Sequence, residues 1–171
     1  MKTNKNKKSP MCRLCGTLGA AILVVLMLLC IPFALPKVLG YQAYTVISGS
    51  MEPAISIGSL LYVKDIEPKE VVEGDIIAFY GGRDTNAVIT HRVVENKVET
   101  KEFVTKGDAN QTVDMNAVMY HHLIGKVEHV IPELGFVAQF ITSPKGKITA
   151  GCMVVAAVIL QFVASLLAKP E

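Results

Sequence analysis

Asp75-Ile76-Ile77-Ala78-Phe79-Tyr80 is a run of mostly apolar residues that leads directly into the turn residues Gly81-Gly82-Arg83-Asp84. A short apolar run bounded by turn residues is typical of a buried strand. Runs of the same kind recur in the middle of the chain, at residues 59–64, 87–94 and 122–130. Residues 98–106 are predicted to form both arms of a hairpin. This spacing predicts a mainly β domain, an antiparallel barrel or sandwich, over residues 40–147.

One stretch of this region has a helical period instead. Residues 134–141 carry Leu134, Phe136, Val137, Phe140 and Ile141, which recur at the spacing of one helix face. We expect this amphipathic segment to lie on a membrane surface.

Two long apolar runs flank the middle region, at residues 14–36 and 148–168. They explain a hydrophobic content of 51% and a mean hydropathy of +0.41. At about 1.5 Å per helical residue, each run can cross a hydrocarbon core of about 30 Å. The alternatives are a cleavable secretory signal for the first run and a buried core helix for the second. The first run is longer than a signal core, and so small a domain has little core to cover a helix. We therefore predict two transmembrane helices.

The charges near the N-terminus predict the orientation of these helices. Residues 1–13 contain Lys2, Lys5, Lys7, Lys8 and Arg13 and no acidic residue. Positive segments stay in the cytoplasm, so we expect a multi-pass protein of the cell membrane with an extracytoplasmic β domain. The tail at residues 169–171 then returns to the cytoplasm. Lys145 and Lys147 fall outside, in mild conflict with the rule.

Charge and cysteine content exclude other classes of function. A net charge of +2 indicates no nucleic-acid partner. The β region contains no cysteine, so its fold needs no internal disulfide. Cys12 and Cys15 have the spacing of half a zinc site without a second pair. We expect no metal and no cofactor.

A few residues of the β region could carry chemistry, and each also has a plainer interpretation. Ser50 lies in Ser48-Gly49-Ser50-Met51-Glu52-Pro53, which by composition is only a bend. His91 shares a strand face with Ile89 and Val93, where a structural histidine is common. Asp108 and Asp114 lie in a segment with turn chemistry. The remaining histidines are interpreted as surface or packing residues, namely His121, His122 and His129; if extended, the first two point to opposite faces.

The order of four motifs is what distinguishes this chain. Ser48-Gly49-Ser50-Met51-Glu52-Pro53 is followed by Gly74-Asp75-Ile76-Ile77-Ala78-Phe79, then Thr90-His91-Arg92-Val93, then Lys106-Gly107-Asp108-Ala109-Asn110, with Asp114 after it. In this order the chain resembles type I signal peptidases, in the endoplasmic-reticulum and archaeal-like branch that uses histidine where most bacterial enzymes use lysine. The resemblance covers the whole middle domain and implies the complex β-fold of those enzymes.

The resemblance also implies roles for individual residues. Ser50 would be the nucleophile of a serine endopeptidase and His91 its general base. An aspartate would orient His91: alignment with the eukaryotic form favours Asp114, and Asp108 is the rival. The backbone N–H of Ser50 and the Ser48 hydroxyl would form the oxyanion site. No lysine occupies the base motif, and Arg92 cannot act as a base.

The implied function is that of a membrane-bound signal peptidase I, which cleaves signal peptides with small residues at the first and third positions before the cut. Its partners would be the signal peptides of exported preproteins and the lipid bilayer, which Met51 and neighbouring apolar residues are expected to contact. Accessory subunits and dedicated substrates stay open. The alternative function is a non-cleaving, signal-peptidase-like assembly factor for pilin or matrix subunits.

Overall fold

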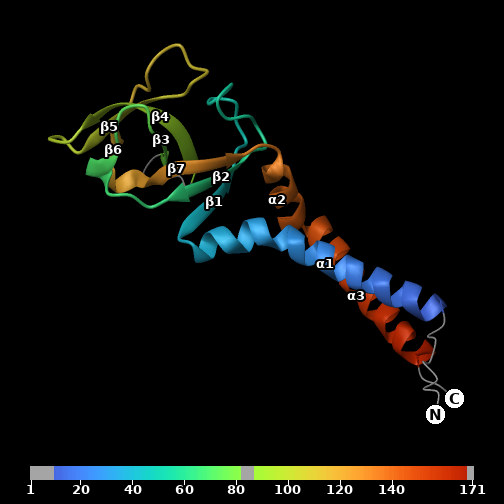
Figure 1. Cartoon of the computed structure of the whole chain (residues 1–171). Coiled ribbons are helices and arrows are strands. Elements are labelled where there is room, and N and C mark those ends of the chain that lie inside the picture. The colour runs from blue at the N-terminus through green and yellow to red at the C-terminus, as the bar shows by residue number, and fades with distance from the viewer. Residues whose placement is uncertain (1–9, 82–86, 169–171) are drawn as a thin grey trace. The chain divides into compact units, whose positions relative to one another are not determined.

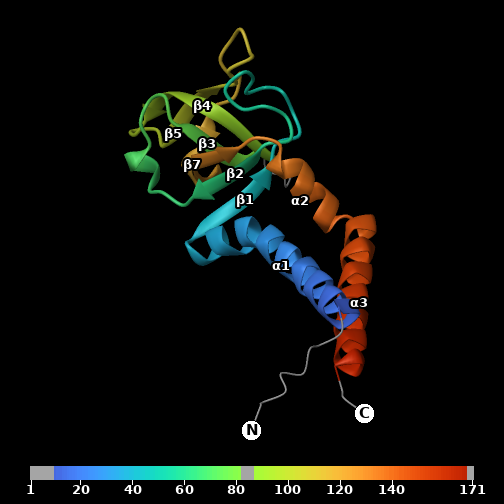
Figure 2. The same ribbon diagram turned by 45° about the vertical axis from the view of Figure 1, so that its right-hand side comes forward.

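The computed structural model describes residues 10–81 and 87–168, and the middle of this chain forms an antiparallel sheet (Figure 1). Its strands are β1 (Tyr41–Thr45), β2 (Leu60–Lys64), β3 (Ile76–Tyr80), β4 (Val88–Lys97), β5 (Glu102–Lys106), β6 (Val118–Met119) and β7 (Leu123–Ile131). The strands are hydrogen-bonded in the order β1-β2-β7-β3-β4-β5-β6. Figure 2 shows from a second direction that the sheet curls round instead of lying flat. The predicted β domain between two long helices is confirmed.

Strand β3 is central because it pairs with β4 on one side and β7 on the other. Ile77 and Ala78 are both fully buried, although they point to opposite faces of the sheet. Ile77 belongs to a cluster with Phe79, Val93 and Phe103. Ala78 belongs to a second cluster with Leu61 and Val63. Two cores, one on each face, explain why β3 is an unbroken apolar run instead of an alternating one.

The strand predictions are confirmed for β2, β3, β4 and β7. The hairpin predicted within residues 98–106 is wrong in its first arm. In the structure the first arm of this hairpin is the end of β4, which continues to Lys97. Residues 98–101, where that arm was predicted to begin, form the turn. Lys101 has a φ of 58°, a conformation of tight turns. Two further strands, β1 and β6, were not predicted.

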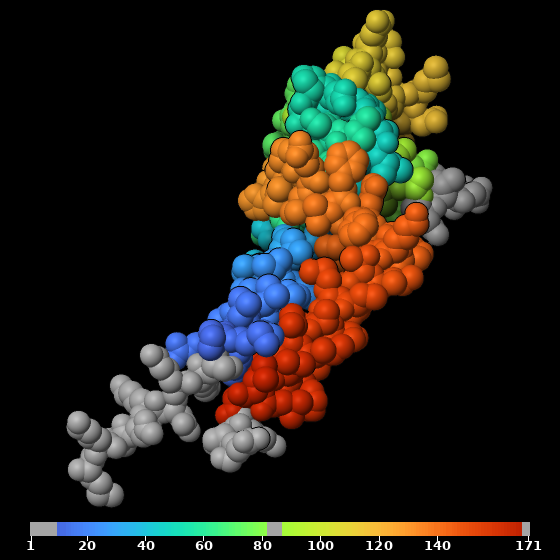
Figure 3. Space-filling view, turned by 90° about the vertical axis from the view of Figure 1, so that its right-hand side faces the viewer, coloured from blue at the N-terminus to red at the C-terminus, as the bar shows by residue number. Residues whose placement is uncertain are grey.

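Helices α1 (Pro10–Val38) and α3 (Pro144–Leu167) are long and apolar enough to cross a membrane, with mean hydropathy of 2.8 and 2.4 in their most apolar windows. They pack against each other, and Figure 3 shows them side by side in blue and red. The Gln161 amide donates to the Gly16 carbonyl at 3.2 Å. A Cβ on Gly19 would lie 3.0 Å from the Ala157 carbonyl oxygen. Small residues thus allow the close approach that membrane helices use for packing.

Both helices begin before the predicted spans at residues 14–36 and 148–168. Helix α3 begins at Pro144 because Ser143 caps it: the Ser143 hydroxyl accepts from the Gly146 amide at 3.0 Å. Its first turn therefore contains Lys145 and Lys147. Residues 1–9 and 169–171 of the predicted cytoplasmic segments lie outside the described residues, and the sidedness of the membrane stays a prediction.

The short helix α2 (Leu134–Thr142) confirms the helical period read at residues 134–141. The first turn of α2 is hydrogen-bonded to the loop before β2: the Gly135 amide donates to the Gly58 carbonyl at 2.9 Å. Gly58 has a φ of 82°, and the ring of Phe136 fills the space where a Cβ would be. The apolar side chains Phe136 and Phe140 are exposed. Their contact with a membrane surface stays a prediction.

Candidate active site

Ser50 lies in the loop between β1 and β2, and the neighbouring backbone fixes its position. The Glu52 amide donates to the Gly49 carbonyl at 3.1 Å and closes a turn around it. Directly after it, Met51 is 2% exposed and packs in the core with Ile55. The expectation that Met51 contacts lipid is therefore wrong. The buried methionine anchors the turn, so that Ser50 remains half-buried at its rim.

His91 lies in β4, and its side chain is 11% exposed. Its ring meets that of Phe79 edge-on, with centroids 6.2 Å apart. The Nδ1 atom is 2.6 Å from Oδ2 of Asp114, in the loop after β5. An ionised carboxylate only accepts hydrogen bonds, so this contact requires a proton on Nδ1; in the neutral imidazole Nε2 is then an acceptor.

Asp108, the rival acid, has a different partner. Its two carboxylate oxygens accept from Nε and NH2 of Arg92 at 2.9 and 2.6 Å. Arg92 also donates to the Gly74 carbonyl at 2.8 Å. The hydrogen bond to Asp108 raises the pKa of Arg92, and burial opposes it. The structure thus brings Asp114, and not Asp108, to His91, a distinction that the sequence left open.

Gly107 lies between the serine and the histidine. A Cβ at this position would be 2.6 Å from the Ser50 carbonyl oxygen and 3.0 Å from His91 Nε2. The backbone amide of Ala109, two residues further along the chain, donates to the same Ser50 carbonyl at 2.9 Å. Among the described residues, neither Ser50 Oγ nor His91 Nε2 has a hydrogen-bond partner. Both atoms are therefore available to a substrate.

For the peptidase activity that the sequence resemblance implies, we expect Gly107→Ala to lower kcat about a hundredfold, because the new methyl group must displace either Ser50 or the His91 ring and misplaced groups lose catalysis steeply. The measurement is kcat on a signal-peptide substrate. Gly151→Ala is the matched control, since no atom lies within 4 Å of a Cβ there. An unchanged kcat in Gly107→Ala would contradict the close approach of the two residues.

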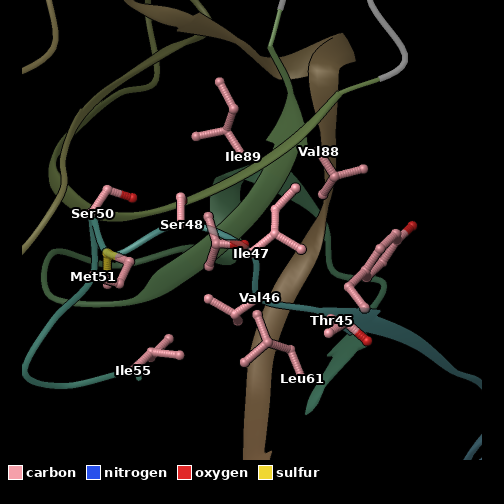
Figure 4. Close-up of a pocket in the computed structure, with 12 residues that line it drawn as sticks. Thr45, Val46, Ile47, Ser48, Ser50, Met51, Ile55, Leu61, Val88 and Ile89 are labelled. Carbon is pink, nitrogen blue, oxygen red and sulfur yellow. The ribbon is translucent and has the colours of Figure 1, made fainter. Parts of the chain in front are cut away.

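A cavity of about 120 Å³ opens beside Ser50. Figure 4 shows its lining: Val46, Ile47 and Ser48 come from the segment after β1, with Val88 and Ile89 of β4 nearby. Ser48 is exposed and lines the cavity together with Ser50. The cavity is small and mostly apolar, so it fits a small apolar side chain next to the serine.

Of the other histidines, His122 lines a cavity that His91 and Asp114 also line. His121 and His122 belong to the short helix η2 (Tyr120–His122), and their ring centroids are 4.2 Å apart. The condition under which they would point to opposite faces, an extended backbone, is not met in this short helix. Within the described ranges, no group of three histidine, cysteine or acidic residues could hold a metal ion.

Curated proteins with similar sequences carry one kind of name. Over 82 residues the chain is 44% identical to signal peptidase I W of Bacillus subtilis, covering 46% of this chain and 42% of that protein. It is 34% identical over 117 residues to SEC11, catalytic subunit of the signal peptidase complex of Komagataella phaffii. This match covers 58% of this chain and 66% of that protein. It is 32% identical over 130 residues to the catalytic subunit SEC11C of Rattus norvegicus. This match covers 68% of this chain and 66% of that protein. No protein-family model matches the chain.

The matches span less than two thirds of the length of each of these relatives. A β domain between two apolar helices, with relatives of this kind, defines the class of the signal peptidases. Within this class the chain belongs to the type I signal peptidase family, in the branch resembling the endoplasmic-reticulum catalytic subunits.

Proposed function

We propose that this chain is a membrane-bound signal peptidase I that cleaves signal peptides from exported preproteins, with Ser50 as nucleophile. One observation carries the proposal: His91 Nδ1 is 2.6 Å from the Asp114 carboxylate, while a Cβ placed on Gly107 would lie 3.0 Å from the opposite ring nitrogen and 2.6 Å from the Ser50 carbonyl oxygen. This is the order of groups that activates a serine.

The proposed reaction begins when Ser50 Oγ attacks the scissile carbonyl and His91 Nε2 accepts its proton. The same imidazolium then gives this proton to the leaving amine. Asp114 holds the ring in the required tautomer and stabilises its positive charge. Water next attacks the acyl-enzyme with His91 again as the base. No cofactor or metal takes part in these steps.

The negatively charged oxygen of the tetrahedral intermediate needs hydrogen-bond donors to stabilise it. The Ser50 amide and the Ser48 hydroxyl are the proposed pair, since both residues line the cavity. Loss of one such donor typically raises the barrier by about 3 kcal/mol.

The proposed site of action is the extracytoplasmic face of the cell membrane. The two apolar helices tether the enzyme to the plane in which a signal helix presents its cleavage site, which raises the effective concentration of the substrate. The relatives named SEC11 are catalytic subunits of a complex. We extend to this chain the expectation of accessory subunits, while a general or a dedicated set of substrates stays open.

The proposal is tested with the purified full-length chain in proteoliposomes and a preprotein whose residue before the cut is alanine. We expect cleavage at one bond, identified by sequencing the new N-terminus. Replacement of this alanine by phenylalanine is expected to lower kcat/KM more than about a hundredfold, because the cavity beside Ser50 admits only a small side chain.

The matched control places phenylalanine at the second position before the cut, where alternation turns the side chain to the other face of an extended substrate. This change is expected to have little effect. The variant Ile89→Ala enlarges the cavity and should recover part of the lost cleavage. Equal cleavage of the alanine and phenylalanine substrates would contradict the assigned cavity.

A further inference from the structure

Thr105 is a buried polar residue next to the proposed catalytic acid. Its residue exposure is 0%, and it lies in β5 directly opposite Val93 of β4. The Thr105 hydroxyl donates to Asp114 Oδ2 at 2.6 Å. The Thr105 carbonyl accepts from the Asp114 amide at 2.9 Å. Thr105 thus contacts Asp114 through both its side chain and its backbone.

A purely packing role does not require this hydroxyl. Thr105 shares a sheet face with Val93, because directly paired residues point the same way. On this face lies the apolar cluster that contains Phe103 and Ile77. Valine has nearly the same shape and would fill the position without the need for a partner. A buried hydroxyl is unfavourable unless it is hydrogen-bonded, and here its partner is Asp114.

The geometry at Oδ2 relates this hydrogen bond to His91. The same carboxylate oxygen is 2.6 Å from both the Thr105 hydroxyl and His91 Nδ1. An ionised carboxylate offers no proton, so both neighbours must donate to it. The hydroxyl fixes the rotation of the carboxylate, and a fixed carboxylate holds the imidazole proton on Nδ1.

We propose that Thr105 is a positioning residue that acts on His91 through Asp114; the inference rests on the proposed peptidase function. The hydrogen-bonded chain runs from the Thr105 hydroxyl to Asp114, then to His91 Nδ1, and leaves Nε2 free for the Ser50 proton. Thr105 touches neither the substrate nor the nucleophile. Its effect is on the tautomer and orientation of the base, and therefore on kcat.

The test compares Thr105→Val with Thr105→Ser in the full-length chain in proteoliposomes. Thr105→Val replaces the hydroxyl with a methyl group, and we expect kcat to fall between about tenfold and a hundredfold with KM unchanged, because a hydrogen bond to a charged group is lost. Thr105→Ser keeps the donor and should retain most of the kcat. Thr100→Val, in the exposed turn after β4, is the control.

Two readouts separate positioning from a structural effect. In the background Asp114→Asn, Thr105→Val should cause no further loss, because residues acting as one unit are not additive. Nitrogen NMR of histidine-labelled protein, with four histidines assigned by substitution, should show one tautomer for His91 in the parent and a mixture in Thr105→Val. If Thr105→Val does not fold, Thr105→Ala replaces it in both measurements.

Equal kcat in Thr105→Val and the parent, or additive losses in the double variant, would overturn the inference. Neither result would contradict the proposed peptidase function, which is tested by the replacement of Ser50. Loss of cleavage in Ser50→Ala together with full activity in Thr105→Val would therefore remove the role of Thr105 alone.

Discussion

Ser50→Ala is expected to abolish signal-peptide cleavage, with a fall in kcat of about 10⁴- to 10⁶-fold, the range seen when a serine nucleophile is removed. The alanine lacks the oxygen that forms the acyl-enzyme, and the remaining backbone donors can only polarise the carbonyl. The fold should not change, because Met51 and the turn at Gly49 hold this segment through other atoms. The measurement is the ratio of preprotein to mature protein after co-expression.

Ser56→Ala is the matched control, since this serine is exposed in the same loop and its side chain has no hydrogen-bond partner among the described residues. It should process preproteins like the parent chain. His91→Ala should be as inactive as Ser50→Ala, and the double variant should lose nothing more. Normal processing by Ser50→Ala would contradict the peptidase mechanism. Retained assembly of pilin or matrix subunits in Ser50→Ala would favour the assembly-factor alternative, for which the molecule offers no specific support.

The central strands could be predicted from the sequence because their burial is simple. Residues 76–80 form an apolar run between turns, and β3 has a sheet neighbour on both sides. The apolar helices were equally clear, since length and hydropathy alone predict them. These elements set the fold class before any long-range contact is considered.

The shorter strands could not be predicted because pairing, not composition, makes them strands. β1 reads Tyr41-Gln42-Ala43-Tyr44-Thr45 and lies at the edge of the sheet, where only β2 holds it. β6 has two residues and pairs only with β5. The boundary between β4 and its turn was missed because Val98 continues the apolar pattern, while the backbone reverses at Lys101.

For the candidate site, motif order predicted which segments matter but not which atoms meet. By composition Asp108 and Asp114 look alike; the resemblance favoured Asp114 with Asp108 as the rival, and the structure places Asp114 beside His91 and Asp108 beside Arg92. Thr105 gave no signal as a functional residue, and Gly107 was quoted only as a member of the fourth motif, without a role of its own. A threonine in a strand and a glycine in a turn are common, and their contacts with Asp114, Ser50 and His91 arise only in three dimensions.

The two aspartates should respond differently to replacement by asparagine. In Asp114→Asn, the new amide group can donate to His91 Nδ1, and the imidazole proton then moves to Nε2, where it blocks proton transfer from Ser50. We expect kcat to fall about 10⁴-fold, as for the corresponding change in a serine triad. The hydrogen bond from the backbone amide of residue 114 to the Thr105 carbonyl does not depend on the side chain and is kept, so the loop should stay in place.

Asp108→Asn weakens the paired hydrogen bonds to Arg92, whose side chain is 36% exposed. Solvent screens such a pair, so the expected cost in unfolding free energy is only about 1 kcal/mol. Activity should fall less than in Asp114→Asn, through loosening of the segment that contains Gly107 and the Ala109 amide. Thermal melting and kcat measured on both variants check this: Asp108→Asn should lower the Tm more, and Asp114→Asn the kcat. A larger loss of kcat in Asp108→Asn would instead assign Asp108 as the acid that His91 requires.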